Sequence, residues 1–195
     1  MGFPVQIRAM AFITMKLTPN QITLSRFFLL ILIILSYEIR FFYLGTVLVI
    51  IGLLSDFLDG YIARKYKKGT AVGIFLDQFV DKLFVHGLLL YFLARGHLGF
   101  LVVLIIILRD DIAVALRYFG IQNQQVMPSI WSGKLKLWLQ GVLLLAVSLE
   151  LMSLIPISAV KILAGITAAW SVISLLHLMY ANRTGLKVLV DGLKK

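Results

Sequence analysis

Six long apolar segments alternate with short polar stretches along the chain. Each is close to the roughly 20 residues that an α-helix needs to cross a bilayer. A tight turn at residues 95–97 separates the third segment from the fourth, and the longest polar stretch, residues 120–134, precedes the fifth. The pattern predicts an all-α, polytopic membrane protein with six transmembrane helices. We expect these helices at residues 21–39, 42–64, 73–94, 98–119, 135–153 and 156–181.

Composition also places these segments in lipid. Hydrophobic residues make up 61% of the 195 residues and charged residues 14%, whereas soluble domains are nearer about half and about a quarter. The length suits one membrane domain over residues 1–195. Residues 1–18 mix apolar side chains with Arg8 and Lys16, which suits an amphipathic helix at the membrane surface. An irregular terminus is the alternative.

The basic residues are distributed unevenly about the expected helices. The formal net charge is +10, and Lys and Arg collect on the cytoplasmic side of membrane proteins. If the chain begins in the cytoplasm, that side receives Arg8, Lys16, Lys65, Lys67, Lys68, Lys134, Arg183, Lys187, Lys194 and Lys195. The other side receives mainly Arg40, Arg95 and Lys161. We expect both ends to face the cytoplasm, with a bacterial inner membrane as the default for so compact a form. Anionic lipid headgroups explain the net positive charge better than nucleic acid does, and we expect no nucleic-acid partner.

Four acidic side chains fall at membrane depth. Of the nine acidic residues, Asp56, Asp59, Asp77 and Asp81 lie within the second and third expected helices. A charged group there costs several kcal/mol unless it is paired, hydrated or metal-bound. The first two are three residues apart and the second two are four apart, so each pair occupies one face of its helix. A short connection joins the two helices, and we expect the four carboxylates to converge near the cytoplasmic side.

Four carboxylates at close range repel one another unless cations neutralise them. Hard divalent cations prefer oxygen ligands, which favours Mg²⁺ or Mn²⁺. Two such ions a few ångströms apart form a clamp for phosphoryl transfer, and we predict two divalent cations here. The chain has no cysteine, and its three histidines lack zinc-ligand spacing, which excludes thiol chemistry and argues against a zinc site.

Small residues and one arginine accompany the carboxylates. Gly60 and Ala63 follow on the second helix, and Gly73 lies one turn before Asp77. Small side chains leave room for a bulky ligand, although taken alone they are better explained by close helix packing. Arg64 lies one turn beyond Gly60, where it can meet a diphosphate oxygen or extend to the membrane interface.

Together these residues form the pattern Asp56-x2-Asp59-Gly60-x2-Ala63-Arg64-x8-Gly73-x3-Asp77-x3-Asp81. The pattern resembles the signature of the CDP-alcohol phosphotransferase family at all eight fixed positions and in the spacing between them. The resemblance implies a six-helix membrane enzyme, usually a homodimer, whose active site opens to the cytoplasm and moves a phosphate-linked group from a CDP-lipid to an alcohol.

The resemblance also assigns roles to residues. The implied metal ligands are Asp56, Asp59, Asp77 and Asp81. The implied CDP-lipid-binding residues are Asp56, Asp59, Gly60, Ala63, Arg64, Gly73 and Asp77. Asp81 would also be the general base that takes the proton from the acceptor hydroxyl, which a carboxylate within hydrogen-bond reach can do.

Outside this signature, the chain most resembles the phosphatidylglycerophosphate synthase branch of the family, whose substrates are CDP-diacylglycerol and glycerol 3-phosphate. The matching residues are Pro19–Arg26, Arg109-Asp110-Asp111, Arg117, Gly133-Lys134-Leu135-Lys136 and Gln140. Two positions depart from the branch: Asp110 stands where Glu is expected, and Leu137 where Thr is common. These departures concern the acceptor and leave the family resemblance intact.

Four basic residues favour a phosphorylated acceptor. Arg109 and Arg117 are eight residues apart, about two helical turns, and Lys134 and Lys136 begin the next expected helix. Arg forks and Lys point charges suit phosphate oxygens, so these four residues form a candidate acceptor phosphate pocket. The alternative pairs Arg109 with Asp110 or with its neighbour, and assigns the lysines to the positive-inside pattern.

Three other functions compete with transfer to glycerol 3-phosphate. The first keeps the chemistry and changes the acceptor, for example to an inositol phosphate. The second is a cation transporter that uses the intramembrane Asp cluster, although no matching polar groups continue to the far side. The third is a non-enzymatic membrane partner, which the complete set of motif carboxylates disfavours.

Overall fold

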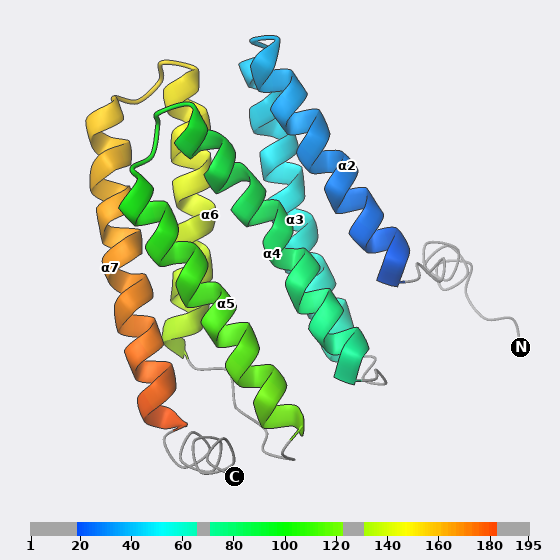
Figure 1. Cartoon of the computed structure of the whole chain (residues 1–195). Coiled ribbons are helices and arrows are strands. Elements are labelled where there is room, and N and C mark those ends of the chain that lie inside the picture. Colours follow the sequence, from blue (N-terminus) through cyan, green and yellow to red (C-terminus); the bar gives the residue numbers. More distant parts are fainter. Residues whose placement is uncertain (1–18, 66–70, 123–130, 183–195) are drawn as a thin grey trace, which may run out of the picture.

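The computed structural model describes the backbone of residues 19–65, 71–122 and 131–182, and the side chains of residues 25–55, 82–116 and 131–182. Within these ranges the chain forms six α-helices that alternate in direction (Figure 1). They are α2 (Pro19–Glu38), α3 (Phe42–Lys65), α4 (Ala71–Ala94), α5 (Phe100–Gln122), α6 (Trp131–Leu151) and α7 (Ile157–Ala181). The predicted all-α fold with six helices is confirmed. Residues 1–18 lie outside the described residues.

The largest difference from the expected limits is at the start of α6. The polar stretch that we expected to end at residue 134 ends earlier, because the helix already begins at Trp131. Contacts with α7 hold this first turn: Trp170 Nε1 donates to the Ser132 carbonyl oxygen at 3.1 Å, and His177 Nδ1 lies 3.1 Å from Ser132 Oγ. Tertiary contacts therefore extend the helix beyond its apolar pattern.

Three helices end in the same way at one end of the bundle. After α2, α4 and α6, one residue takes a left-handed backbone conformation: Arg40 (φ 63°), Gly96 (φ 80°) and Ser153 (φ 58°). The amide that follows each of them bonds back five residues, as in Phe41 N to Ser36 O at 2.8 Å. This is the Schellman arrangement, which satisfies the last carbonyls of a helix. It makes the three hairpin turns short and places them together (Figure 1).

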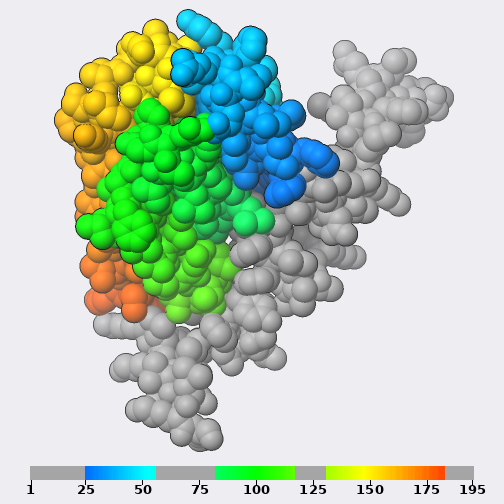
Figure 2. Space-filling view, turned by 45° about the horizontal axis from the view of Figure 1, so that its top comes forward, coloured from blue at the N-terminus to red at the C-terminus, as the bar shows by residue number. Residues whose placement is uncertain are grey.

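The helices contact one another in a closed ring. α2 packs against α3 and α4, α4 against α5, α5 against α7, α7 against α6, and α6 against α3, while α4 also touches α6. Figure 2 shows α4 and α5 in green between α2 in blue and the yellow and orange of α6 and α7. The interior of the ring therefore receives side chains from every helix.

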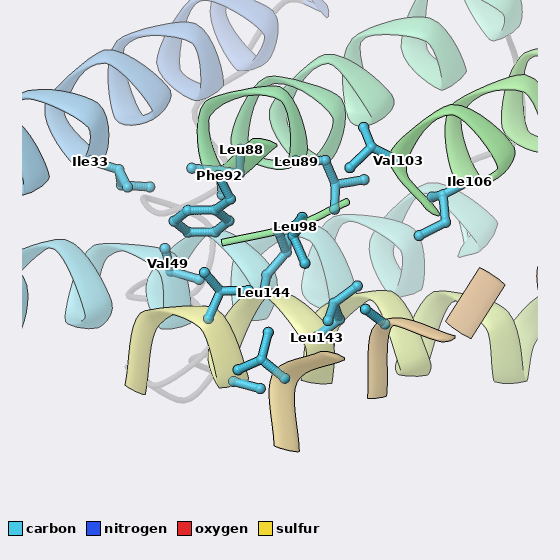
Figure 3. Close-up of a cluster of buried hydrophobic side chains, with 14 of the residues drawn as sticks. Ile33, Val49, Leu88, Leu89, Phe92, Leu98, Val103, Ile106, Leu143 and Leu144 are labelled. Carbon is cyan, nitrogen blue, oxygen red and sulfur yellow. The ribbon is translucent and has the colours of Figure 1, made fainter. Parts of the chain in front are cut away.

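An apolar core fills the half of the bundle nearer the three turns (Figure 3). Its fully buried members come from all six helices and include Ile33, Val49, Leu88, Leu89, Phe92, Val103, Ile106, Leu143, Leu144 and Val160. Arg109 and Asp110 follow this core on α5, and Gln140 and Lys136 precede it on α6. A polar layer thus lies below the apolar one, toward the other end of the bundle.

Helix α7 has its polar side facing inward. Its buried residues are Val160, Ala164, Thr167, Ala168, Ser171, Ser174 and Leu178. Its large exposed residues are Ile157, Ile162, Ile166, Val172, Ile173, Leu176, Met179 and Tyr180. Small and hydroxyl-bearing residues inside, with large apolar residues outside, suit a helix surrounded by lipid.

The described residues support the membrane expectation in part. Among them, α7 is the one helix long and apolar enough to cross a membrane by length and composition, and two thirds of its apolar window lies unburied. Shorter apolar stretches occupy Phe42–Ser55 and Lys82–Ala94. Large exposed apolar side chains nevertheless occur on all six helices, as expected of helices that contact lipid or another protein.

Candidate active site

Helices α3 and α4 come into direct contact at Gly52. A Cβ added at this glycine would lie 2.4 Å from Cζ of Phe84, so the Phe84 ring rests on the α3 backbone. The two helices are antiparallel, and this contact therefore fixes which residues lie level with one another. Asp59 lies seven residues after Gly52 on α3, and Asp77 lies seven residues before Phe84 on α4. These two positions are therefore level with one another.

The same register brings the other two motif acids level. Asp56 lies four residues after Gly52, and Asp81 three residues before Phe84. Residues three, four or seven apart share a helix face, so the four acidic positions continue the faces along which α3 and α4 meet at Gly52. At about 1.5 Å of rise per residue, the two levels lie roughly 5 Å and 10 Å beyond that contact.

The motif residues occupy the connected ends of these helices. Asp56, Asp59, Gly60, Ala63 and Arg64 fall in the last ten residues of α3, and Gly73, Asp77 and Asp81 in the first eleven of α4. Their side chains lie outside the described residues, and their convergence on metal ions stays a prediction. Among the side chains that the structure describes, no group of three or more His, Asp or Glu is placed to hold a metal. Four carboxylates on two matched levels are a donor set that fits oxygen-liganded divalent cations.

A second polar site, which we call the Asp110 cluster, lies between α4, α5, α6 and α7. It consists of Lys82, His86, Arg109, Asp110, Lys136, Gln140 and Ser174. Asp110 is 2% exposed. Its Oδ1 accepts hydrogen bonds from Arg109 Nη1 at 3.2 Å and from Lys136 Nζ, and its Oδ2 accepts one from Gln140 Nε2 at 3.1 Å. Both carboxylate oxygens are therefore engaged by buried donors.

Helix α4 links this cluster to the acidic motif. Lys82, which directly follows Asp81, donates to the backbone oxygen of Asp110. One turn later, His86 Nε2 lies 3.5 Å from Asp110 Oδ2, while its Nδ1 is 4.0 Å from the exposed Asp111. The two polar sites thus adjoin along one helix.

Arg109 ties the cluster to α6 and α7. Its Nη2 donates to Ser174 Oγ on α7, and a Cβ added at Gly133 on α6 would lie 3.6 Å from the same nitrogen. Gly133 thus leaves room for the guanidinium. Within the described part of the chain, Arg109 Nε is buried and has no hydrogen-bond partner, which leaves one donor of the fork for another acceptor.

The buried charges of the cluster do not balance. Arg109 and Lys136 are 6% and 0% exposed, and Asp110 is the one described buried carboxylate beside them. The side chain of Asp111 is 57% exposed. Burying unbalanced charge is costly, and an anion that enters the cluster lowers that cost. The charge balance of the cluster therefore favours an anionic group beside Arg109 and Lys136.

The structure describes the side chains of three of the four residues of the predicted acceptor pocket and brings two of them together. Arg109 and Lys136 meet at Asp110, so the pairing that the sequence left as an alternative is present. Lys134 lies two residues before Lys136 on α6 and is exposed, since residues two apart point to different faces of a helix. Arg117 belongs to α5, and its side chain lies outside the described residues.

Sequence reasoning missed three members of the cluster. Lys82 had a signal, because a lysine beside Asp81 at membrane depth needs a partner. His86 was considered as one of three histidines without zinc-ligand spacing, and its place beside Asp110 could not be read from the chain. Ser174 had no signal, because serine is common wherever membrane helices touch.

Comparison with known proteins relates this geometry to one family. Residues 16–177 match CDP-alcohol phosphatidyltransferase. A CDP-diacylglycerol–glycerol-3-phosphate 3-phosphatidyltransferase of Mycoplasma pneumoniae is 35% identical over 94 residues, covering 48% of this chain and 41% of that protein. The proteins of the same name from Rickettsia typhi and Bacillus subtilis are 33% and 32% identical, over 65% of this chain in both cases and over 72% and 64% of their own lengths. The match thus spans less than half of the Mycoplasma relative.

Proposed function

Since this chain belongs to the CDP-alcohol phosphatidyltransferase family of membrane enzymes, we propose that it transfers the phosphatidyl group of CDP-diacylglycerol to glycerol 3-phosphate. The products are phosphatidylglycerophosphate and CMP. The names of the curated relatives support this pair of substrates. An inositol phosphate as acceptor is the alternative within the same chemistry.

One observation carries the proposal. The contact of Phe84 with Gly52 sets a register in which Asp59 is level with Asp77 and Asp56 with Asp81. Carboxylates on two matched levels suit a pair of oxygen-liganded cations. We propose that Asp56, Asp59, Asp77 and Asp81 hold two Mg²⁺ or Mn²⁺ ions, which would neutralise the diphosphate of the donor.

The other motif residues bind the donor in this scheme. Gly60, Ala63 and Gly73 leave room for the cytidine, and Arg64 meets the diphosphate. Asp81 takes the proton of the acceptor hydroxyl. The hydroxyl oxygen then bonds to the phosphorus of the phosphatidyl group, the bond from that phosphorus to the bridging oxygen breaks, and CMP leaves with the electron pair.

The Asp110 cluster is the proposed acceptor site. Arg109 and Lys136 are buried with one carboxylate between them, and Arg109 Nε has no partner among the described residues. A phosphate that joins this cluster balances its excess positive charge and engages the free donor. We keep Arg117 and Lys134 in the proposal from the sequence, as further basic residues for the acceptor phosphate.

The membrane arrangement completes the proposal. Six helices with apolar outer faces would span the membrane, with both termini and the α3–α4 motif on the cytoplasmic side of a bacterial inner membrane. CDP-diacylglycerol would then enter laterally from the lipid. We also propose a homodimer, which the family resemblance implies.

The test is CMP release by purified protein in detergent. CDP-diacylglycerol is supplied with Mg²⁺ or Mn²⁺, and glycerol 3-phosphate, inositol phosphate, inositol and serine are tested in parallel. We expect release with glycerol 3-phosphate only, its loss on chelation with EDTA, and its return when Mg²⁺ or Mn²⁺ is restored. CMP release with another alcohol would show that glycerol 3-phosphate is not the acceptor. CMP release in the presence of EDTA would contradict the proposed pair of divalent cations.

A further inference from the structure

Asp110 occupies an unusual position among the cluster residues. It is an acid buried to 2% exposure, and four groups from three helices surround its carboxylate. Arg109 and Lys136 share Oδ1, Gln140 donates to Oδ2, and His86 lies 3.5 Å from Oδ2. Both oxygens of this carboxylate are engaged by groups of the protein itself.

The shared oxygen has a consequence for the two cations. Arg109 and Lys136 come from different helices, α5 and α6, and carry like charges at close range. Like charges repel strongly in a buried setting, and both side chains have many rotamers. The Asp110 carboxylate offsets that repulsion and holds both groups against a single atom.

We propose that Asp110 is a positioning residue for the acceptor phosphate. Its carboxylate assembles Arg109 and Lys136 into a preformed pair of cations, so that the phosphate of the acceptor meets an ordered site. This inference rests on the proposed function, because the acceptor phosphate is the anion that the pair receives. The inference adds that the residue that positions the two cations is an acid, although a carboxylate on its own would repel the acceptor phosphate.

Two other roles for Asp110 give different results. If the acid only balanced charge, its removal would leave a more positive site and tighten phosphate binding. If it only supported the fold, its removal would reduce the amount of folded enzyme and leave the KM values of the remaining enzyme unchanged. A positioning role raises the KM for the acceptor and leaves the KM for the donor alone.

The experiment compares Asp110→Asn, Asp110→Glu and Asp111→Asn with the wild type. Asn keeps the shape and loses the charge, Glu keeps the charge, and Asp111 is the adjacent acid whose side chain is 57% exposed. CMP release is measured against the concentration of each substrate, and folding is followed by thermal unfolding in detergent. For Asp110→Asn we expect the KM for glycerol 3-phosphate to rise about 10-fold or more, as when a group that holds a ligand-binding side chain is removed. The KM for CDP-diacylglycerol should stay unchanged, Asp110→Glu should stay within about 3-fold of wild type, and Asp111→Asn should match wild type.

Several outcomes overturn the inference. An unchanged or lower acceptor KM in Asp110→Asn does so, and so does an equal rise in both KM values. If Asp110→Asn does not fold, Gln140→Met takes its place, because it removes the bond to Oδ2 and keeps the charge. A selective rise in acceptor KM then supports the inference, and an unchanged value overturns it.

Failure of the proposed function can be distinguished from failure of the inference about Asp110. Wild-type enzyme is measured first, and if it uses inositol phosphate in place of glycerol 3-phosphate, the same variants are compared with that acceptor. A wild-type enzyme that uses only an unphosphorylated alcohol overturns the inference together with the acceptor, while the family chemistry stands.

Discussion

Two polar regions adjoin along α4 and carry opposite imbalances of charge. The fixed positions of the α3–α4 motif comprise four Asp and one Arg. The Asp110 cluster has one described buried acid beside two buried cations, Arg109 and Lys136. The boundary between them runs between two neighbours, Asp81 and Lys82. An enzyme that joins a metal-bound diphosphate to an anionic acceptor needs both imbalances side by side, since one attracts cations and the other attracts an anion.

The largest effect should come from the acidic region. Replacement of Asp81 by Asn removes a carboxylate from the proposed metal set and the proposed general base together. We expect the rate of CMP release at saturating substrate to fall by roughly 10²- to 10⁴-fold. Asp111→Asn is the control, because it removes an exposed acid outside the motif. A rate near wild type in Asp81→Asn would contradict the proposed roles of this carboxylate as metal ligand and general base, and with them the catalytic role of the acidic region.

A smaller and more selective effect is expected from the basic region. Arg109→Gln removes a buried cation that bonds to Asp110 and Ser174. Loss of one partner of a buried charged pair corresponds to about 30-fold or more in affinity, so we expect the KM for glycerol 3-phosphate to rise by that factor. The KM for CDP-diacylglycerol should change little.

The control for Arg109 is a second arginine at the opposite end of the bundle. Arg95 is half exposed and pairs with Glu38 near the turns, where surface ion pairs contribute little. Arg95→Gln should leave both KM values as they are. Equal effects of the two arginine variants would indicate that loss of positive charge in general, and not the Asp110 cluster, lowers acceptor affinity.

The sequence predicted the six helices because their apolar segments are long and are separated by turns or short polar stretches. It placed turns near Arg40, Gly96 and Ser153, between the expected helices, but only at Gly96 does a glycine signal the left-handed residue. Arg40 and Ser153 adopt the same conformation through helix-end hydrogen bonds. Periodicity alone could not supply the register of α3 against α4, because it depends on one ring lying over Gly52. The candidate basic residues were visible in the sequence, and Asp110 was noted both as a departure from the family pattern and as a possible partner of Arg109. The sequence held no signal that Lys136 and Gln140 of the next helix also bond to Asp110.

The register itself can be tested at Gly52. Gly52→Val places side-chain atoms where the Phe84 ring lies, 2.4 Å from an added Cβ. Overpacking of this kind costs about 1–3 kcal/mol, and we expect a lower melting temperature in detergent. CMP release should also fall, because a shifted register moves Asp59 relative to Asp77. Gly165→Val is the matched control, since nothing lies within 4 Å of a Cβ added there. Adding Phe84→Ala to Gly52→Val should restore part of the activity. If it does not, the loss of activity in Gly52→Val has a cause other than the register of α3 against α4.

The smallest effect should distinguish two lysines on one helix. Lys134 and Lys136 both begin α6, yet Lys136 is fully buried on Asp110 while Lys134 is exposed. An exposed charge is screened by water and salt, so Lys134→Gln should change the KM for glycerol 3-phosphate by less than about 3-fold. Lys136→Gln should raise the same KM by about 10-fold or more, because it removes a buried charged partner. Raising the ionic strength should reduce the small effect of Lys134 and leave that of Lys136, since salt screens buried pairs much less. Equal effects from the two variants would mean that the acceptor senses the net charge of this end of the bundle, and the contrast between the acidic and basic regions would then lose its structural basis.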